Sequence, residues 1–434
     1  MSLENKSFAI IGYGVSGKAM CDYLLSNGVF PTVRTPSPTE VPKGVAQINE
    51  NYLCTREDVI IRSPSVRPDK IKGKGAVTTE AAYALEITKG FKIGVSGSSG
   101  KTTSVSLIYE ILRCDGKDAR LCGNIGTPII AYAPSSTEKS YTVCELSSFQ
   151  LMDACPSLDV ALLTNISENH LDWHTDMREY EEAKSHLLKN AALCVLNYDD
   201  TRVRSIYKGT GKRAFFSLDG LPRSVSDAQV RAYLSGNALY CNGVKIIDAD
   251  DVGLRGRFNI ANALGAACAV WDTVDIDSIR NTLRTFKGVS GRMELVDTLN
   301  GVDFISSSID STPSRTVATL SALNASRCVV ILGGYDKGVS YEPLREAMRG
   351  IRGAVLIGAN ADKIEHAIKD SAHVCRASTL KDAVEIAFAM ARTGDTVLLS
   401  PASASFDMFE NYKDREEKFK EAIRGLKWKK SKSF

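Results

Sequence analysis

The segment 92–104, "KIGVSGSSGKTTS", constrains the fold of this chain more than any other stretch. An apolar run leads into a glycine-rich turn, and the amphipathic run "TTSVSLIYEILR" follows directly. Gly97 and Gly100 permit a tight turn in which successive backbone N–H groups and a helix N-terminus face an anion. Lys101 can then reach the outer phosphates of a nucleotide, and the Thr102 hydroxyl can ligate Mg²⁺. The pattern predicts a strand, a phosphate loop and a helix that together bind ATP. The residues of this predicted ATP site are Gly97, Ser98, Ser99, Gly100, Lys101, Thr102 and Thr103.

Short apolar runs alternate with helix-length segments along the whole chain. Runs of four to six residues that end in Gly, Ser or Asn and precede a helical stretch are typical of parallel strands buried on both faces. The chain is therefore predicted to be α/β, with its chemistry in the loops at the carboxyl ends of the strands. The runs are "SFAIIGYG", "DVIIRS", "FKIGVSG", "YTVCELS", "VALLTNI", "LCVLNYD", "CVVILGG", "GAVLIGA" and "DTVLLSP".

With 434 residues, the chain is too long for one ordinary hydrophobic core. A new strand begins after a helical stretch at 87–97, and glycines separate a helix from another strand at 285–296. We predict three domains: a Rossmann-like domain over 1–88, a central domain of the P-loop ATPase type with a parallel or mixed sheet over 89–288, and a second Rossmann-like domain over 289–434.

The composition argues against nucleic acid or an anionic membrane as the main partner, because 54 Lys and Arg nearly balance 51 Asp and Glu. Eleven cysteines are scattered singly without a C-x-x-C pair, which is typical of reduced thiols in a cytosolic enzyme. The N-terminus lacks the pattern of a signal peptide, and no window has 18 uninterrupted apolar residues. We expect a monomer in the cytoplasm.

A second glycine motif, G-x-G-x-x-G, lies in "FAIIGYGVSGKAM" (8–20) behind another apolar run. A dinucleotide site would place an acidic residue about 20 positions further on, at the end of the second strand. Arg34 and Thr35 stand there instead, and no acidic residue follows before Glu40. A nicotinamide-dependent oxidoreductase is therefore a weak alternative, and a phosphate cradle of another kind fits the motif better.

The phosphate loop departs from the common G-x-x-x-x-G-K-[ST] pattern, because Val95 occupies the position of the first glycine. The shorter form found here, Ser96 to Thr102, resembles the loop of Mur ligases and folylpolyglutamate synthetases, which are ATP-dependent enzymes that form amide bonds. Further segments follow in the order of the Mur ligases' central domain. They are "GNIGTP" (123–128), "CELSSFQL" (144–151), "LTNISENHLDWH" (163–174) and "YEEAKSHLL" (180–188).

Two of these segments, with "SPAS" at 400–403, are similar to the branch of Mur ligases that adds D-glutamate to UDP-N-acetylmuramoyl-L-alanine. The resemblance covers nearly the whole chain and implies a role in the cytoplasmic synthesis of peptidoglycan precursors. It also implies that the carboxylate of the UDP substrate is first phosphorylated by ATP, and that D-glutamate then displaces phosphate from the acyl phosphate.

The resemblance implies a centre with two Mg²⁺ ions. Glu145 ends an apolar run and can share Mg²⁺ with Thr102, although alone it could be an ordinary carboxylate. By resemblance, Lys184 carries CO₂ as a carbamate and joins His170 around the second ion. Considered alone, His170 could be a structural hydrogen-bonding residue and Lys184 could lie on a solvated helix face; His174 receives no role. The implied catalytic residues are Lys101, Glu145, His170 and Lys184.

Two further segments resemble ATP contacts of the family. Asn259 and Asn262 lie in "GRFNIANALGAA" (256–267), and their side chains carry both a donor and an acceptor. Alternatively, Asn259 caps a helix. Arg292 in "SGRMELV" matches an arginine that reaches the nucleotide, which suits its planar guanidinium.

The largest departure from the family is "FISSSIDSTPSRT" (304–316). Ser307 and Ile309 stand where many relatives carry Asp and Lys. We expect Asp310 to replace the missing carboxylate at the ATP site, and we assign no role to Ile309.

The resemblance also implies two substrate sites. The domain over 1–88 would hold the UDP moiety with help from the central domain, and the domain over 289–434 would hold the amino acid. Residues implied for the UDP substrate are Gly14, Val15, Ser16, Ser63 and Asn124. Residues implied for the amino acid are Lys337, Ser405, Phe406 and Tyr412, of which the lysine could equally be a surface residue and the serine a helix cap.

Three other functions remain open from the sequence. A Mur-type ligase could use another amino acid. A folylpolyglutamate synthetase is disfavoured because roughly 90 residues precede the phosphate loop here, whereas that enzyme needs no such domain. A regulatory protein that binds ATP without turnover would explain the altered 304–316 segment, but the intact catalytic set disfavours it.

Overall fold

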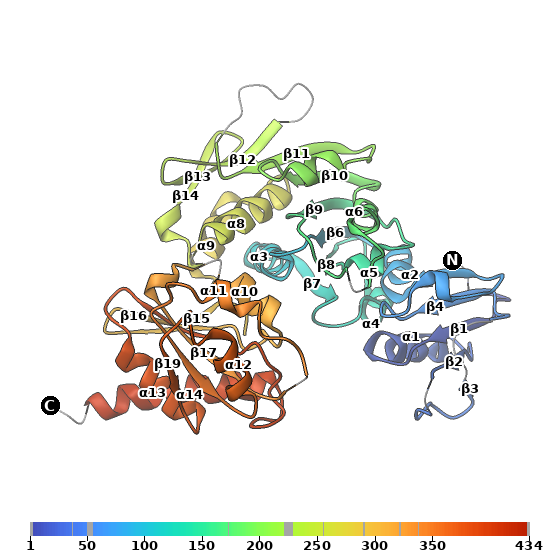
Figure 1. The fold of residues 1–434 in the computed structure, drawn as a ribbon. Helices are drawn as coiled ribbons and strands as arrows, with labels where there is room; N and C mark the ends of the chain where they lie inside the picture. The colour runs from blue at the N-terminus through green and yellow to red at the C-terminus, as the bar shows by residue number, and fades with distance from the viewer. Residues whose placement is uncertain are drawn as a thin grey trace. The chain divides into compact units, whose positions relative to one another are not determined.

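The fold is known from a computed structural model (Figure 1), which describes residues 3–36, 38–49, 55–171, 173–220, 229–254, 256–289, 291–320, 323–336 and 338–431. Within these residues the strands form three sheets, separated along the sequence in the order predicted. The chain divides into two compact units. One comprises 1–252 and 259–285, and the other comprises 253–258 and 286–434.

The first sheet has the strand order β3-β2-β1-β4-β5 and is parallel throughout its described pairs. All four residues of β1 and of β4 are buried, as expected for central parallel strands covered on both faces. Its strands are β1 (Phe8–Ile11), β2 (Thr32–Arg34), β3 (Ala46–Ile48), β4 (Val59–Arg62) and β5 (Ala76–Thr79). The helices are α1 (Val15–Ser26), α2 (Glu80–Ile87) and the 3₁₀ turn η1 (Pro68–Lys70).

The second sheet has the order β14-β13-β12-β11-β10-β9-β6-β8-β7. It is parallel from β7 to β12 and antiparallel in β12, β13 and β14. Its strands are β6 (Phe91–Ser96), β7 (Asp118–Gly123), β8 (Ser140–Glu145), β9 (Ser157–Leu163), β10 (Asn190–Asn197), β11 (Lys212–Ser217), β12 (Gln229–Ser235), β13 (Ala238–Cys241) and β14 (Val244–Asp248). The helices are α3 (Lys101–Cys114), α4 (Ile129–Tyr132), α5 (Ser148–Leu151), α6 (Met177–Ser185), α7 (Thr201–Ser205), α8 (Arg257–Val270) and α9 (Ile276–Thr285), with 3₁₀ turns η2 (Ala133–Ser135) and η3 (Ala249–Asp251).

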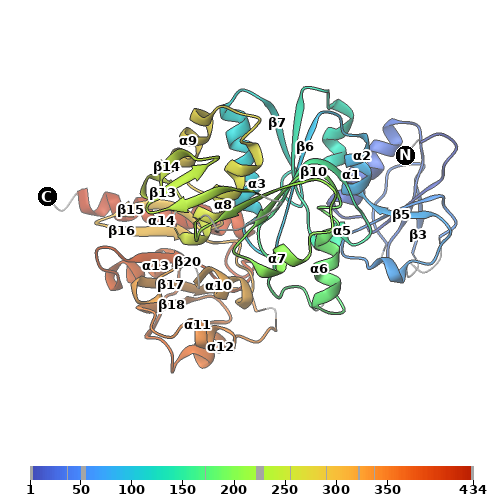
Figure 2. The same ribbon diagram turned by 90° about the horizontal axis from the view of Figure 1, so that it is seen from above.

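The first two sheets share one apolar core. It runs from Phe8 and Met20 beside the first sheet to Leu163 and Phe215 in the second. Helix α3 packs on β7 and β8 and lies beside α9 (Figure 2). The phosphate loop between β6 and α3 therefore sits on a continuous buried scaffold.

The third sheet has the order β15-β16-β20-β17-β18-β19, in which only the described pair β15–β16 is antiparallel. Its strands are β15 (Glu294–Leu299), β16 (Val302–Ser306), β17 (Cys328–Gly333), β18 (Gly353–Ile357), β19 (Val374–Arg376) and β20 (Thr396–Leu399). The helices are α10 (Pro313–Leu320), α11 (Leu344–Ala347), α12 (Ala361–Ile368), α13 (Leu380–Met390) and α14 (Tyr412–Ser431), with the 3₁₀ turn η4 (Ala325–Arg327).

The predicted α/β class is confirmed, and each of the nine predicted apolar runs forms a strand. The domain boundaries at 88 and 288 stay predictions. Among the described residues, no helix is both long enough and apolar enough to cross a membrane.

Candidate active site

The phosphate loop has the predicted form, with β6 ending at Ser96 and α3 beginning at Lys101. Gly97 has a φ of +150° and Gly100 has a φ of +78°, and residues with a side chain rarely adopt these values. A Cβ atom on Gly97 would lie 1.9 Å from Thr164 Oγ1, so no larger residue fits there. The loop is tied to the end of β9, because Asn165 Oδ1 accepts a hydrogen bond from the Ser99 N–H at 2.9 Å.

Two lysines converge on this loop. Lys101 Nζ and Lys184 Nζ each donate to the Gly97 carbonyl oxygen at 2.8 Å. Lys184 lies near the end of α6 and is 1% exposed, so the alternative of a solvated helix face is wrong. Burial, and next the charge of Lys101, hold the pKa of the Lys184 amine well below its usual range. The structure therefore favours a neutral amine at this position.

Glu145 joins three predicted segments at the carboxyl end of β8. Its Oε2 accepts from the Thr102 hydroxyl at 2.7 Å, and its Oε1 accepts from Asn124 Nδ2 at 2.9 Å. The carboxylate is 1% exposed. A carboxylate beside a hydroxyl at the mouth of a phosphate loop offers the hard oxygen ligands that Mg²⁺ prefers. This donor set fits the predicted magnesium site.

His170 lies in the turn that follows β9 and has a left-handed backbone, with a φ of +57°. Its carbonyl oxygen accepts from the His174 N–H at 2.9 Å, and its ring packs edge-on against Phe149, with centroids 4.8 Å apart. His170 is exposed, whereas Glu145 and Lys184 are buried. A non-glycine residue in this strained conformation is held there by its surroundings, which is common at functional sites.

Helix α8 begins at Arg257, so Asn259 lies inside the helix and the capping alternative is wrong. Both predicted asparagines are buried. Asn262 Nδ2 donates to Asn259 Oδ1 at 3.2 Å, and Asn262 Oδ1 accepts from the Ser104 hydroxyl at 3.3 Å. The pair therefore lies against the first turn of α3, next to the phosphate loop.

The glycine motif within 8–20 forms a tight turn at the start of α1 (Val15–Ser26). A Cβ atom on Gly12 would lie 2.8 Å from Ser63 Cβ, and one on Gly17 would lie 2.3 Å from the Gly12 carbonyl oxygen. Space remains open at Gly14, and Val15 is 74% exposed. Packing therefore requires glycine at positions 12 and 17, whereas the open space at Gly14 leaves the N-terminus of α1 accessible.

Sequence analysis missed Glu80, which is 2% exposed at the start of α2. Its Oε1 accepts from the Ile130 N–H at 2.7 Å, and its carboxyl group also bonds the Ser16 side chain. Burial raises the pKa of Glu80 to about 7. The residue thus links the predicted UDP cradle to α4, and no local pattern marks such a contact.

The second unit carries the predicted amino-acid residues. Ser405 is buried, whereas Phe406 is 67% exposed and Tyr412 is 37% exposed. Arg292 forms an isolated bridge with Val289, and its N–H donates to the Val289 carbonyl oxygen at 2.8 Å. Lys337 lies outside the described residues.

Two buried charges organise this unit. Asp310 Oδ2 accepts from the hydroxyls of Thr319 at 2.7 Å and Ser400 at 2.8 Å. Arg415, which sequence analysis missed, donates to the carbonyl oxygens of Ser308, Ser403 and Ala404. Burial lowers the pKa of Arg415 to about 10. The arginine therefore holds the start of the altered segment against the "SPAS" loop.

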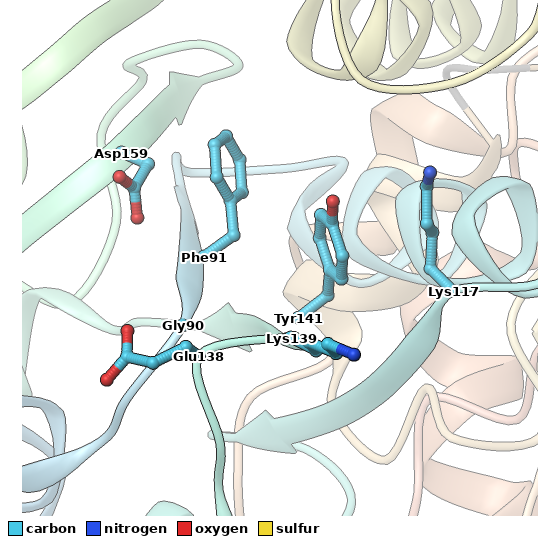
Figure 3. Close-up of a pocket in the computed structure, with 7 residues that line it drawn as sticks. All are labelled: Gly90, Phe91, Lys117, Glu138, Lys139, Tyr141 and Asp159. Atoms are coloured by element: carbon cyan, nitrogen blue, oxygen red, sulfur yellow. The ribbon is translucent and has the colours of Figure 1, made fainter.

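A surface pocket lies at the amino-terminal ends of the central strands (Figure 3). Phe91 begins β6, and its ring centroid is 5.5 Å from that of Tyr141. The phosphate loop follows the opposite end of β6, so this pocket is separate from the predicted ATP site.

Comparisons with known proteins identify the family of this chain. Residues 95–270 match the Mur ligase middle domain, and residues 291–403 match the glutamate ligase domain of Mur ligases. The UDP-N-acetylmuramoylalanine–D-glutamate ligase of Clostridium botulinum (strain 657 / Type Ba4) is 36% identical over 98% of both chains. The chain belongs to the Mur ligase family. The enzyme of the same name from Clostridium kluyveri (strain NBRC 12016) is also 36% identical to this Mur ligase, over 98% of both chains.

Solved structures show the same fold. The UDP-N-acetylmuramate-alanine ligase of Thermotoga maritima covers 97% of this Mur ligase and 100% of its own chain, with a TM-score of 0.58 and 16% identity. The MurF ligase of Thermotoga maritima was solved in complex with ADP. The match covers 96% of this Mur ligase and 95% of that chain, with a TM-score of 0.57 and 16% identity. The predicted family and class, an ATP-dependent ligase that forms amide bonds, are confirmed.

Proposed function

We propose that this Mur ligase joins D-glutamate to UDP-N-acetylmuramoyl-L-alanine with consumption of ATP, in the cytoplasmic synthesis of peptidoglycan precursors. Relatives of that name match it over 98% of both chains. The observation that carries the chemistry is the convergence of Lys101, Lys184 and Glu145 on one phosphate loop.

In the first half-reaction, a carboxylate oxygen of the UDP substrate attacks the γ-phosphorus of ATP, and the bond to the β-phosphate oxygen breaks. This transfer needs charge neutralisation and alignment rather than a protein nucleophile. The Lys101 ammonium and the N–H groups between Gly97 and Thr102 supply both. In the second half-reaction, the amine of D-glutamate attacks the acyl carbon. Phosphate leaves, and the amine loses a proton.

Thr102 and Glu145 are the residues that would hold Mg²⁺, which neutralises phosphate charge in such transfers. The buried Lys184 amine is suited to add CO₂, with release of one proton, because only a neutral amine reacts. The product would be a carbamate anion beside Lys101. The carbamate would offer Mg²⁺ a hard oxygen ligand in place of an amine that repels the ion when protonated. The roles of His170, Asn259, Asn262, Arg292 and Asp310, and of the substrate residues, stay predictions.

The decisive test is ADP release with UDP-N-acetylmuramoyl-L-alanine and a panel of amino acids. We expect D-glutamate to stimulate release strongly and Lys101→Ala to abolish it. Stimulation by another amino acid alone would identify a different Mur-type specificity. No stimulation by any amino acid would contradict the proposed function.

A further inference from the structure

A compact set of contacts joins the loop 63–67, which follows β4, to the turn before α6. Arg67 binds Glu179 through two parallel hydrogen bonds, Nη1 to Oε2 at 3.0 Å and Nη2 to Oε1 at 2.9 Å. Its Nη1 also donates to the Trp173 carbonyl oxygen at 2.6 Å, and its guanidinium lies 5.1 Å from the Trp173 ring. The indole N–H donates back to the Ser65 carbonyl oxygen at 3.2 Å. A forked and stacked arginine fixes orientation as well as distance.

The contacts continue from Glu179 to His174. Glu179 Oε2 lies 3.3 Å from His174 Nδ1 and accepts from the Thr175 N–H at 2.8 Å. On the other side of the ring, His174 Nε2 lies 2.9 Å from the Ser148 hydroxyl. Burial lowers the pKa of His174, which favours the neutral ring between these two side chains. The imidazole thus bridges α6 and α5.

The same ring reaches the phosphate loop through its neighbours. His174 stacks on Phe149, with centroids 5.7 Å apart, and meets the Tyr180 ring edge-on at 5.2 Å. The Tyr180 hydroxyl lies 2.8 Å from Ser98 Oγ in the phosphate loop. Lys184 Nζ lies over the Tyr180 ring, 4.6 Å from its centroid. The contact set therefore runs without a gap from the loop 63–67 to the phosphate loop.

We propose that Arg67, Glu179 and His174 are positioning residues that hold the loop 63–67 against α5 and α6, and so fix the UDP end of the substrate relative to the phosphate loop. We call these three residues the clamp. The inference rests on the proposed function, in which Ser63 contacts the UDP moiety. No member of the clamp touches a reacting atom. Arg62 Nη1 also donates to the Val66 carbonyl oxygen at 3.0 Å, so loss of the clamp loosens the loop without detaching it. The loosened loop binds the UDP substrate more weakly, whereas the affinity for D-glutamate is unaffected.

The test compares Glu179→Gln, His174→Asn and Arg67→Lys with the control Glu181→Gln in the full-length enzyme. Glu181 lies on the same helix and pairs with Arg202 at 2.7 Å, at an exposed site outside the clamp. Glu179→Gln and Arg67→Lys disrupt the bidentate charged contact, and His174→Asn removes the ring that bridges α5 and α6. Each clamp variant should therefore raise KM for UDP-N-acetylmuramoyl-L-alanine about tenfold or more. Arg67→Lys keeps the charge but removes the fork and the planar contact with the Trp173 ring. KM for D-glutamate should stay unchanged in every variant.

Hydrogen exchange of the Val66 and Arg67 amides gives a second readout that does not depend on turnover. Exchange should accelerate in the clamp variants and stay as in the wild type in Glu181→Gln. Unchanged exchange, or faster exchange with an unchanged KM for the UDP substrate, would overturn the clamp. The clamp would also be overturned if Glu181→Gln raised KM for UDP-N-acetylmuramoyl-L-alanine as much as the clamp variants do. The wild-type assay alone tests the proposed function: if the wild type does not turn over UDP-N-acetylmuramoyl-L-alanine, the proposed function is wrong, whatever the variants show.

Discussion

Lys101 and Lys184 donate to one acceptor, the Gly97 carbonyl oxygen, each at 2.8 Å. Two ammonium groups that share one acceptor repel each other. Lys101 is half-buried and water can screen its charge, whereas Lys184 is 1% exposed and its charge would be desolvated. Burial, and next the charge of Lys101, therefore hold the pKa of the Lys184 amine well below its usual range. Carbamate formation requires a neutral amine, which this position favours.

Replacement of Lys184 by Ala should abolish most of the ligase activity, by about 100-fold or more, because the oxygen anion proposed to form there is lost. Short carboxylic acids added in millimolar excess should restore part of it. The measurement is ADP release with all three substrates, and Lys189→Ala on the adjacent exposed surface is the control. Near-normal activity of Lys184→Ala would contradict the carbamate.

The Gly97→Ala variant should lose about 2–4 kcal/mol of unfolding free energy, because the new Cβ would meet Thr164 Oγ1 at a φ of +150°. ATP binding should be lost with it. Denaturant titration and nucleotide binding measure the two effects. Gly425→Ala is the control, since Gly425 lies within α14 in open space and should gain up to about 1 kcal/mol. Equal stability of the two variants would contradict the steric argument.

Glu80→Gln should reduce the pH dependence of stability. The pKa of Glu80 rises from 4.5 to about 7 on folding. Its protonated carboxyl group therefore contributes fully to the free energy of unfolding below pH 4.5, and this contribution is lost as the pH rises through 7. Glutamine keeps an acceptor for the Ile130 N–H without the buried charge. At pH 8 the variant should be more stable than the wild type by up to about 3 kcal/mol, with little difference at pH 5. Denaturant titrations at both pH values measure this, and an equal gain at pH 5 would refute it.

Arg415→Met should lower the unfolding free energy by about 3 kcal/mol, because several buried carbonyl oxygens lose their donor. KM for D-glutamate should rise as well, since Ser405 follows the loop that Arg415 holds. Lys418→Met, at an exposed site on the same helix, should change neither quantity. An unchanged thermal midpoint in Arg415→Met would show that the carbonyl groups find other partners.

The nine apolar runs of the sequence analysis form β1, β4, β6, β8, β9, β10, β17, β18 and β20. They are mostly central strands, buried on both faces, and read as uninterrupted apolar runs. The strands it did not mark include edge strands such as β3 and β19 and the antiparallel series β12 to β14. These have mixed polarity because a face or an edge meets solvent.

The amino-acid sequence by itself determined the phosphate loop, the strand end that carries Glu145, and membership of the Mur ligases. These features lie in contiguous stretches, where backbone conformation and residue type act over a few positions. Only the tertiary structure decided that Lys184 is buried against Gly97, 87 positions away, and that Glu80 bonds Ile130, 50 positions away. It also decided that His174 bridges two helices. Burial and charge depend on neighbours brought together by folding, so the spacing of residues along the chain carries no measure of them.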